Sequence, residues 1–240
     1  KYKVYIDDNT IVLYEDVIIK YNLEYKKDID DKLLKDIEKD NLKSSIYDSA
    51  IKYIAFRMRS KKEIIEYLRK KEYSEKDINN TVDRLINNNM INDEIFCKSY
   101  INDKLNLSNV GINKIIGELS NLGIDENIIN NNISNIDNEI IIVRLKNLID
   151  KEIKLNNKVP TFKLKNKIVN KFITLGYRAE DIYEIINNIN IKTNSDINKD
   201  YNILYKKYNN KYDEYKLKVF IKNKLYQKGY SVDDINNLFQ

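Results

Sequence analysis

A unit of about 50 residues recurs four times in this sequence, and the recurrence constrains the fold more than any other feature. Each copy follows the pattern K-x-x-I-x-x-x-L-x-x-x-x-[YI]-[SD]-x-x-x-I with small slips. The closing isoleucines are Ile78, Ile128, Ile182 and Ile235, which gives steps of 50, 54 and 53 residues. A nearly constant period is typical of repeat proteins, whose successive units stack to build one core.

Helical spacing of apolar residues predicts that each copy holds about three short helices. Ser60 and Ser74 are predicted N-caps, because Glu63 and Asp77 follow three residues later. In the first copy, the apolar spacing predicts that these residues face the core: Ile64, Ile65, Leu68, Ile78, Val82, Leu85 and Ile86. Glycines follow helices at equivalent places, where a left-handed residue ends a helix at low cost. They are Gly123, Gly176 and Gly229, and Glu72 takes that place in the first copy.

The segment before the repeats predicts a small cap. Alternating residues around Asp8-Asn9 indicate a β-hairpin, followed by helices near 15–21 and 30–40. We therefore predict an all-α solenoid of tandem three-helix repeats with an N-terminal hairpin and helix cap. Its parts are a cap over 1–43 and repeats over 44–91, 92–137, 138–190 and 199–240. Pro160 should break the third repeat, and 188–202 is the best linker candidate.

The composition argues against an enzyme. There is no histidine, so the commonest general base and metal ligand are missing, and we expect no catalytic residue, metal or cofactor. The lone Cys97 is better explained as a small buried residue than as a nucleophile. The acidic pairs Asp7-Asp8, Asp30-Asp31 and Asp233-Asp234 fit capping and turn roles better than metal binding, so a metal-dependent phosphodiesterase has little support.

Neither secretion nor membrane insertion is expected. The sequence starts KYKVYIDD without the apolar stretch of a signal peptide, no run approaches the roughly 20 apolar residues that span a bilayer, and one cysteine forms no intrachain disulfide. We expect a cytoplasmic protein that is a monomer.

Positive charge recurs along the chain. The stretches 57–71, 151–171 and 199–228 are basic, while the net charge is only +5. Such a distribution suits a surface that tracks a groove or filament, although solvated helix faces explain it equally well. Four tyrosines interleave with lysines, where they could stack bases or line the repeat core: Tyr205, Tyr208, Tyr212 and Tyr215.

Residues 50–129 resemble the RecX family of regulators of the bacterial RecA recombinase. The resemblance rests on an alanine-headed helix, an R-x-R-S motif, and two later motifs, D-x-x-[FY]-A-x-x-[YW]-[VI] and a glycine-bounded close. The matching residues are Ala50, Arg57, Arg59, Ser60, Glu63, Leu68, Asp93, Phe96, Tyr100, Ile101, Gly111, Ile115, Leu119, Gly123 and Ile124. Cys97 stands where the family usually has alanine, and Lys104 where arginine is common. The hairpin and the repeats over 138–240 look like the longer forms of low-GC Gram-positive bacteria.

The resemblance implies a regulator that lies in the groove of RecA filaments on single-stranded DNA and inhibits or remodels them, with direct DNA contact weak. The residues that it implies at the interface are Arg57, Arg59, Lys62, Arg69, Lys104, Lys165, Lys167, Lys218, Lys222 and Lys224. For Arg57, an ion pair with Glu63 that holds the repeat together is an equal alternative. A helical-repeat protein that binds nucleic acid independently of RecA is the competing function, because of the basic stretches.

Overall fold

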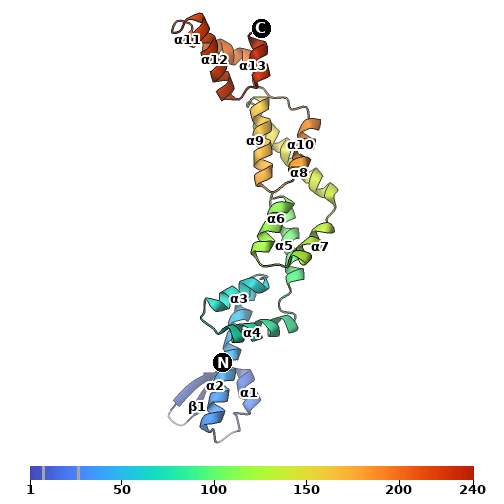
Figure 1. The fold of residues 1–240 in the computed structure, drawn as a ribbon. Coiled ribbons are helices and arrows are strands. Elements are labelled where there is room, and N and C mark those ends of the chain that lie inside the picture. Colours follow the sequence, from blue (N-terminus) through green and yellow to red (C-terminus); the bar gives the residue numbers. More distant parts are fainter. Residues whose placement is uncertain (7–8, 26–27) are drawn as a thin grey trace. The chain divides into compact units, whose positions relative to one another are not determined.

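The computed structural model describes residues 1–6, 9–25 and 28–240, and over that part of the chain it contains thirteen helices and two short strands (Figure 1). The predicted all-α repeat class with a small N-terminal hairpin is confirmed. The chain forms two compact units, Lys1–Tyr100 with Glu118–Asn131 and Ile101–Gly117 with Asn132–Gln240. No helix in the described part of the chain is long and apolar enough to cross a membrane.

The N-terminal cap begins with the predicted hairpin. Strand β1 (Tyr2–Ile6) pairs antiparallel with β2 (Asn9–Leu13), with Val4 opposite Ile11. The predicted turn residue Asp8 and the pair Asp7-Asp8 lie outside the described residues. Helix α1 (Glu15–Tyr21) follows as predicted. A small core formed by Leu13, Val17, Ile18 and Ile37 joins these elements to the next helix.

Helix α2 (Asp31–Ile54) is a single 24-residue helix, so the helix predicted near 30–40 continues without a break into the first repeat. The predicted border between cap and first repeat at 43/44 falls inside it. Asn41 is polar at this position because its side chain binds the hairpin: Oδ1 accepts from the Tyr14 amide at 3.0 Å, and Nδ2 donates to the Val12 carbonyl at 2.9 Å. Without a glycine or proline in this stretch, nothing breaks the helix.

The first repeat consists of the second half of α2, α3 (Lys61–Arg69) and α4 (Glu75–Asn87), which contact one another pairwise. Its buried core includes Ile46, Ala50, Ile64, Leu68, Ile78, Val82 and Leu85. Ile65 is half-buried, and Ile86 is exposed although the pattern directed it inward. Consecutive residues on a helix are about 100° apart, and here the buried Leu85 leaves Ile86 turned away from the core.

The second repeat consists of α5 (Asp93–Leu107), α6 (Ile112–Asn121) and α7 (Glu126–Ser134). The structure corrects the repeat register here: the residue equivalent to Ile78 is Ile129, not Ile128. Ile129 is 1% exposed and donates its amide to the carbonyl of Asp125, as Ile78 does to Ser74. The register was assigned one residue too early because Ile128 and Ile129 are adjacent, and the sequence pattern does not distinguish them.

The last two repeats each form a three-helix group. The third contains α8 (Asn138–Leu155), α9 (Thr161–Thr174) and α10 (Ala179–Asn188), with Pro160 capping α9 as the predicted break requires. The fourth contains α11 (Ile197–Tyr208), α12 (Glu214–Lys228) and α13 (Val232–Leu238). The non-helical linker covers only 189–196, since Asp196 caps a helix inside the predicted 188–202 stretch.

The three equivalent glycines end α6, α9 and α12 in the left-handed region, with φ of +79°, +89° and +109° at Gly123, Gly176 and Gly229. Glu72 takes the same conformation after α3, with φ of +63°. A side chain there costs roughly 1 kcal/mol in strain. Glu72 is exposed in this conformation, whereas a Cβ on any of the three glycines would collide with a neighbouring repeat.

Each glycine abuts the start of the second helix of the preceding repeat. In the first unit, a Cβ on Gly123 would lie 2.7 Å from Cβ of Lys62 in α3. In the second unit, a Cβ on Gly176 would lie 2.5 Å from the backbone nitrogen of Lys114 in α6, and one on Gly229 would lie 2.5 Å from Cβ of Lys163 in α9. The glycines are therefore fixed by close approach between repeats as well as by their backbone angles.

At this joint the end of one helix completes the hydrogen bonds of another. The Gly111 amide donates to the Leu175 carbonyl at 2.7 Å, and the Asn113 amide donates to the Gly176 carbonyl at 3.0 Å. Helix starts have unpaired amides and helix ends have unpaired carbonyls, so each end satisfies the other. The partial charges of the two helix ends also attract. One contact thus joins successive repeats and caps two helices.

The joint predicts a contrast between two glycines of the second unit. Gly176→Ala should destabilise the protein by about 2 kcal/mol, because the added methyl group combines left-handed strain with a backbone collision. Gly117→Ala should be neutral or stabilise by roughly 0.5–1 kcal/mol, because nothing lies within 4 Å of its Cβ and alanine favours a helix. Thermal and urea unfolding would measure both. Equal stability of the two variants would contradict this account of the joint.

Candidate functional site

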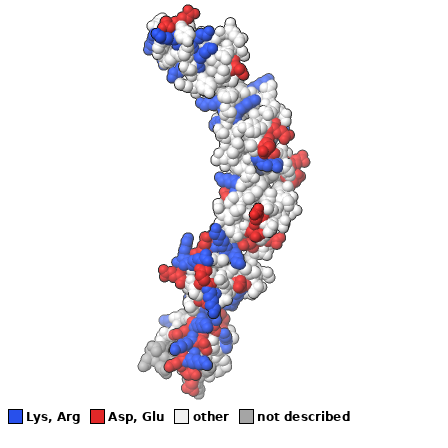
Figure 2. Space-filling model, in the orientation of Figure 1, with Lys and Arg blue, Asp and Glu red and all other residues white. Residues whose placement is uncertain are grey.

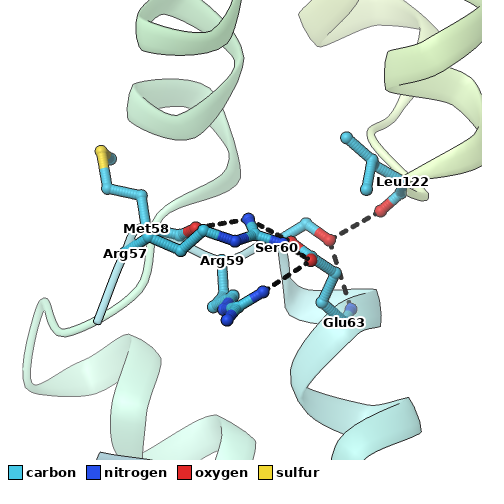
Figure 3. A network of polar contacts seen from close by, with 6 residues as sticks. All are labelled: Arg57, Met58, Arg59, Ser60, Glu63 and Leu122. Atoms are coloured by element: carbon cyan, nitrogen blue, oxygen red, sulfur yellow. Dashed lines mark hydrogen bonds and ion pairs between the residues drawn. The ribbon is translucent and has the colours of Figure 1, made fainter. Parts of the chain in front are cut away.

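A polar network surrounds the start of α3 in the first unit (Figure 3). Ser60 is fully buried, and its hydroxyl accepts from the Glu63 amide at 3.2 Å and donates to the Leu122 carbonyl at 2.7 Å. The Glu63 carboxylate in turn accepts from the Ser60 amide at 3.1 Å, which completes the predicted capping box. Ser60 therefore caps α3 and binds the end of α6 at the same time.

Two arginines converge on Glu63 from the loop after α2. Arg57 Nη2 lies 2.5 Å from Glu63 Oε1, and Arg59 Nη1 lies 3.3 Å from the same oxygen. The predicted Arg57–Glu63 ion pair is thus present. The Arg57 side chain remains 53% exposed, whereas that of Arg59 is only 14% exposed. Arg57 can therefore reach a partner more readily than Arg59 can.

Arg59 is held by an aromatic stack. Its guanidinium lies 4.1 Å from the centre of the Tyr53 ring, and Tyr53 stacks on Tyr67 with ring centres 4.0 Å apart. A cation over a tyrosine face is attracted by the electrons of the ring. Arg59 Nε is buried without a hydrogen-bond partner, which indicates that stacking, rather than a hydrogen bond, positions this part of the side chain. Arg59 acts mainly as a link between α2 and α3.

Residues far apart in the resemblance motif meet at this point. The Lys61 amide donates to Asp93 Oδ1 at 2.8 Å, which joins the start of α5 to the start of α3. Lys62 Nζ donates to the Asn121 carbonyl at 2.9 Å, and its aliphatic stem covers Gly123. Ser60, Glu63, Asp93 and Gly123 therefore hold the joint between the first two repeats.

Opposing effects act on the Glu63 carboxyl group. Burial raises its pKa, but the hydrogen bond from the Ser60 amide and the charge of Arg57 outweigh burial and lower the pKa below its usual value. The ionised form is thus the one that the joint stabilises.

The other predicted cations of α3 and α5 have different surroundings. Arg69 makes a bidentate pair with Glu75 at 2.6 and 2.8 Å and stays 55% exposed. Exposed pairs of this kind contribute little to stability, so Arg69 can exchange Glu75 for another carboxylate. Lys104 is half-buried in the last turn of α5, within the second unit.

Lys165 and Lys167 lie on α9. Lys165 is half-buried and lines a cleft of about 690 Å³ between the third and fourth repeats. Lys167 is exposed but bound internally, with Nζ 2.6 Å from Asn156 Oδ1 and 3.3 Å from Glu152 Oε1. Glu152 is buried and also pairs with Lys171. Lys167 therefore serves in part to neutralise a buried carboxylate.

Lys218, Lys222 and Lys224 project from α12. Lys218 and Lys222 lie over the Phe239 ring at 5.6 and 5.2 Å, and Lys224 lies 5.6 Å from the Phe220 ring centre. Lys222 also donates to Asn236, and Lys224 to Gln227. None of the three forms an ion pair with a described residue, so no acidic side chain in that part of the chain neutralises their positive charge.

The sequence offered no signal for Arg144 of α8, which makes three side-chain hydrogen bonds within the second unit. Its guanidinium donates to the carbonyls of Ser108 and Val110 and to the Tyr177 hydroxyl. It fastens the loop before α6 to the third repeat, beside the Gly176 joint. Because all three acceptors are distant along the chain and two are backbone atoms, no residue pattern marks them.

Catalytic alternatives gain no support. Burial raises the pKa of the Cys97 thiol, and the nearby Asp93 and Glu94 carboxylates raise it further, which disfavours the reactive thiolate. The described residues include no group of three or more acidic or cysteine side chains that could hold a metal ion. Asp30 and Asp234 cap helices, as predicted for these acidic pairs.

Comparisons with known proteins agree on one family. Residues 47–85 match the model described as RecX, first three-helix domain. "Regulatory protein RecX" of Streptococcus agalactiae is 31% identical over 237 residues, 96% of this chain and 91% of that protein. The Bacillus cytotoxicus protein of the same name is 29% identical over 251 residues, covering 100% of this chain and 92% of its own.

Solved structures are also similar. A crystal structure of regulatory protein RecX has a TM-score of 0.67 at 21% identity and covers 78% of this chain and 92% of its own. The crystal structure of RecX from Lactobacillus salivarius has a TM-score of 0.57 at 27% identity, over 60% and 94%.

The network at α3 predicts how stability changes with pH. A lowered folded-state pKa means that Glu63 contributes its full stabilisation above its unfolded pKa of about 4.3, and that this contribution is lost as the pH falls through the folded value. Glu63→Gln should therefore cost about 1 kcal/mol at pH 7 and less near pH 3. Urea unfolding at both pH values measures the difference. The matched variant Glu75→Gln, which removes an exposed pair, should change stability little at either pH.

Proposed function

Because this chain belongs to the RecX family of regulatory proteins, we propose that it binds RecA filaments on single-stranded DNA and inhibits or remodels them. The main support is the similarity to proteins named RecX over nearly the whole chain. Such a regulator would modulate recombination and DNA repair in the cytoplasm, and as a monomer it needs no second copy to complete its surface.

The repeat architecture supports this role physically. Each repeat presents its own cations, so a chain of repeats can make several weak contacts with a polymer that itself repeats. Once one repeat is bound, the others act at a high effective concentration, and weak contacts add to firm binding. Binding along a filament would obstruct the entry of a homologous duplex without any chemical step by this chain.

The exposed cations that can exchange or lack an internal partner are the best interface candidates. Arg57 and Arg69 are more than half exposed, although Arg57 pairs with the largely buried Glu63 whereas Arg69 pairs with the exposed Glu75. Lys218, Lys222 and Lys224 complete this group. Arg59, Lys62 and Lys167 have structural partners, and we propose for them a smaller direct contribution to binding.

RecA assays test the proposed function. The purified protein should slow RecA-dependent ATP hydrolysis and strand exchange at less than one molecule per RecA protomer. Arg57→Ala/Arg69→Ala should weaken this inhibition roughly tenfold, since arginines are common among residues that dominate binding energy. The control Lys32→Ala/Lys35→Ala removes the same charge from exposed positions of α2 and should inhibit like the wild type. An unchanged RecA reaction at every dose would exclude the proposal.

A second candidate, binding of nucleic acid without RecA, is favoured by one observation. The fourth repeat exposes four tyrosines, and of its lysines only Lys216 and Lys228 form an ion pair with a described residue.

A further inference from the structure

The fourth repeat contains a cleft whose walls are aromatic. It lies between α11 and the start of α12, has a volume of about 510 Å³, and has the buried side chains of Leu217 and Ile221 at its base. Tyr201, Tyr205, Tyr212 and Phe239 form its walls. Its volume is within the range of about 300–1,000 Å³ that is typical of small-ligand sites.

The rings of this cleft are held in place but not covered. Tyr205 stacks on Tyr201 with ring centres 5.8 Å apart, and Tyr212 stacks on Phe220 at 5.1 Å. Tyr205 remains 43% exposed and Tyr212 40% exposed. Of the four tyrosines that the sequence places among lysines, the half-buried Tyr208 packs against the core, whereas Tyr215 is 78% exposed. Fixed rings with free faces suit stacking of a flat ligand.

Polar groups at the rim can recognise the edge of such a ligand. The Asn209 amide offers both donors and an acceptor, and the Glu214 carboxylate offers acceptors. Both side chains are exposed and have no hydrogen-bond partner among the described residues. The ammonium group of Lys218 lies on the same rim.

The charge around the cleft selects a polyanion. Seven lysines of this repeat make no ion pair with a described residue: Lys199, Lys206, Lys207, Lys211, Lys218, Lys222 and Lys224. Two of the nearby acids are neutralised, because Asp200 pairs with Lys228 at 2.5 Å and Asp213 pairs with Lys216 at 3.0 Å. Figure 2 shows lysines spread over the part of the surface that Figure 1 labels α11 and α12.

We propose that this cleft binds an unpaired base of single-stranded nucleic acid, with the surrounding lysines binding the phosphates on either side. Stacking requires a base whose face is free, which a duplex does not offer, and the lysines outside the cleft require a ligand longer than one nucleotide. An acidic peptide would satisfy the lysines but leave the tyrosine faces unused. The site functions without RecA and therefore does not depend on the proposed filament binding.

Binding of a labelled 30-nucleotide oligo-dT to the full-length chain, without RecA, tests this proposal. The wild type should bind the single strand more tightly than a duplex of the same length or polyphosphate. Tyr205→Leu/Tyr212→Leu should weaken single-strand binding about tenfold or more. Lys206→Ala/Lys207→Ala should weaken binding of the single strand and of polyphosphate alike, and should reduce the salt dependence.

The control is Tyr226→Leu, which removes a 59% exposed tyrosine of α12 that lies outside the cleft, and which should bind like the wild type. Thermal unfolding checks that each variant is folded. Unchanged oligo-dT binding by a folded Tyr205→Leu/Tyr212→Leu variant would overturn the proposal, as would equal affinity of the wild type for polyphosphate. Loss of RecA inhibition with unchanged oligo-dT binding would mark the cleft as a protein-binding surface. Oligo-dT binding without any effect on RecA would remove only the proposed function.

Discussion

The structure depends on the way one repeat meets the next, with a glycine turn of one pressed against the start of a helix in the other. Helix starts and ends each leave polar backbone groups without partners, and a short repeat has many such ends for its size. Hydrogen bonds between the end of one helix and the start of another give partners to both sets of backbone groups, and they set the spacing of the repeats. A side chain at Gly123, Gly176 or Gly229 would separate the two surfaces. Glu72 is free of this constraint because it belongs to the first repeat, before which there is only the cap.

The same joint changes how the resemblance motif is understood. Ser60, Glu63, Asp93 and Gly123 are spread over more than 60 residues, yet all contact the start of α3 or its neighbour. These residues maintain the architecture. Both arginines of the motif pair with Glu63, but the Arg57 side chain stays more than half exposed and can reach a partner, while Arg59 is enclosed by Tyr53 and Glu63.

Local features of the sequence predicted most of the fold. The N-caps at Ser60 and Ser74, the break at Pro160 and the left-handed position at Glu72 depend on interactions within a few residues, so they are visible in the sequence. Features that depend on residues distant in the sequence could not be predicted from it. The continuity of α2 is explained by Asn41 reaching the hairpin, and Arg144 by carbonyls more than 30 residues away. At the candidate site, the sequence identified the cations and allowed the Arg57–Glu63 pair, but only the structure separates bound cations from free ones.

The uninterrupted α2 helix links the hairpin core at one end with the first repeat at the other. Gene duplication lengthens repeat proteins by inserting whole units at their borders, and here the border that the sequence suggests at 43/44 is the middle of a helix. A unit inserted there would interrupt α2 between Asn41 and Ile46. It would separate the core of the hairpin cap from the core of the first repeat, both of which contain residues of this helix. Variation in the number of repeats should therefore be confined to positions after this helix, where loops lie between the units.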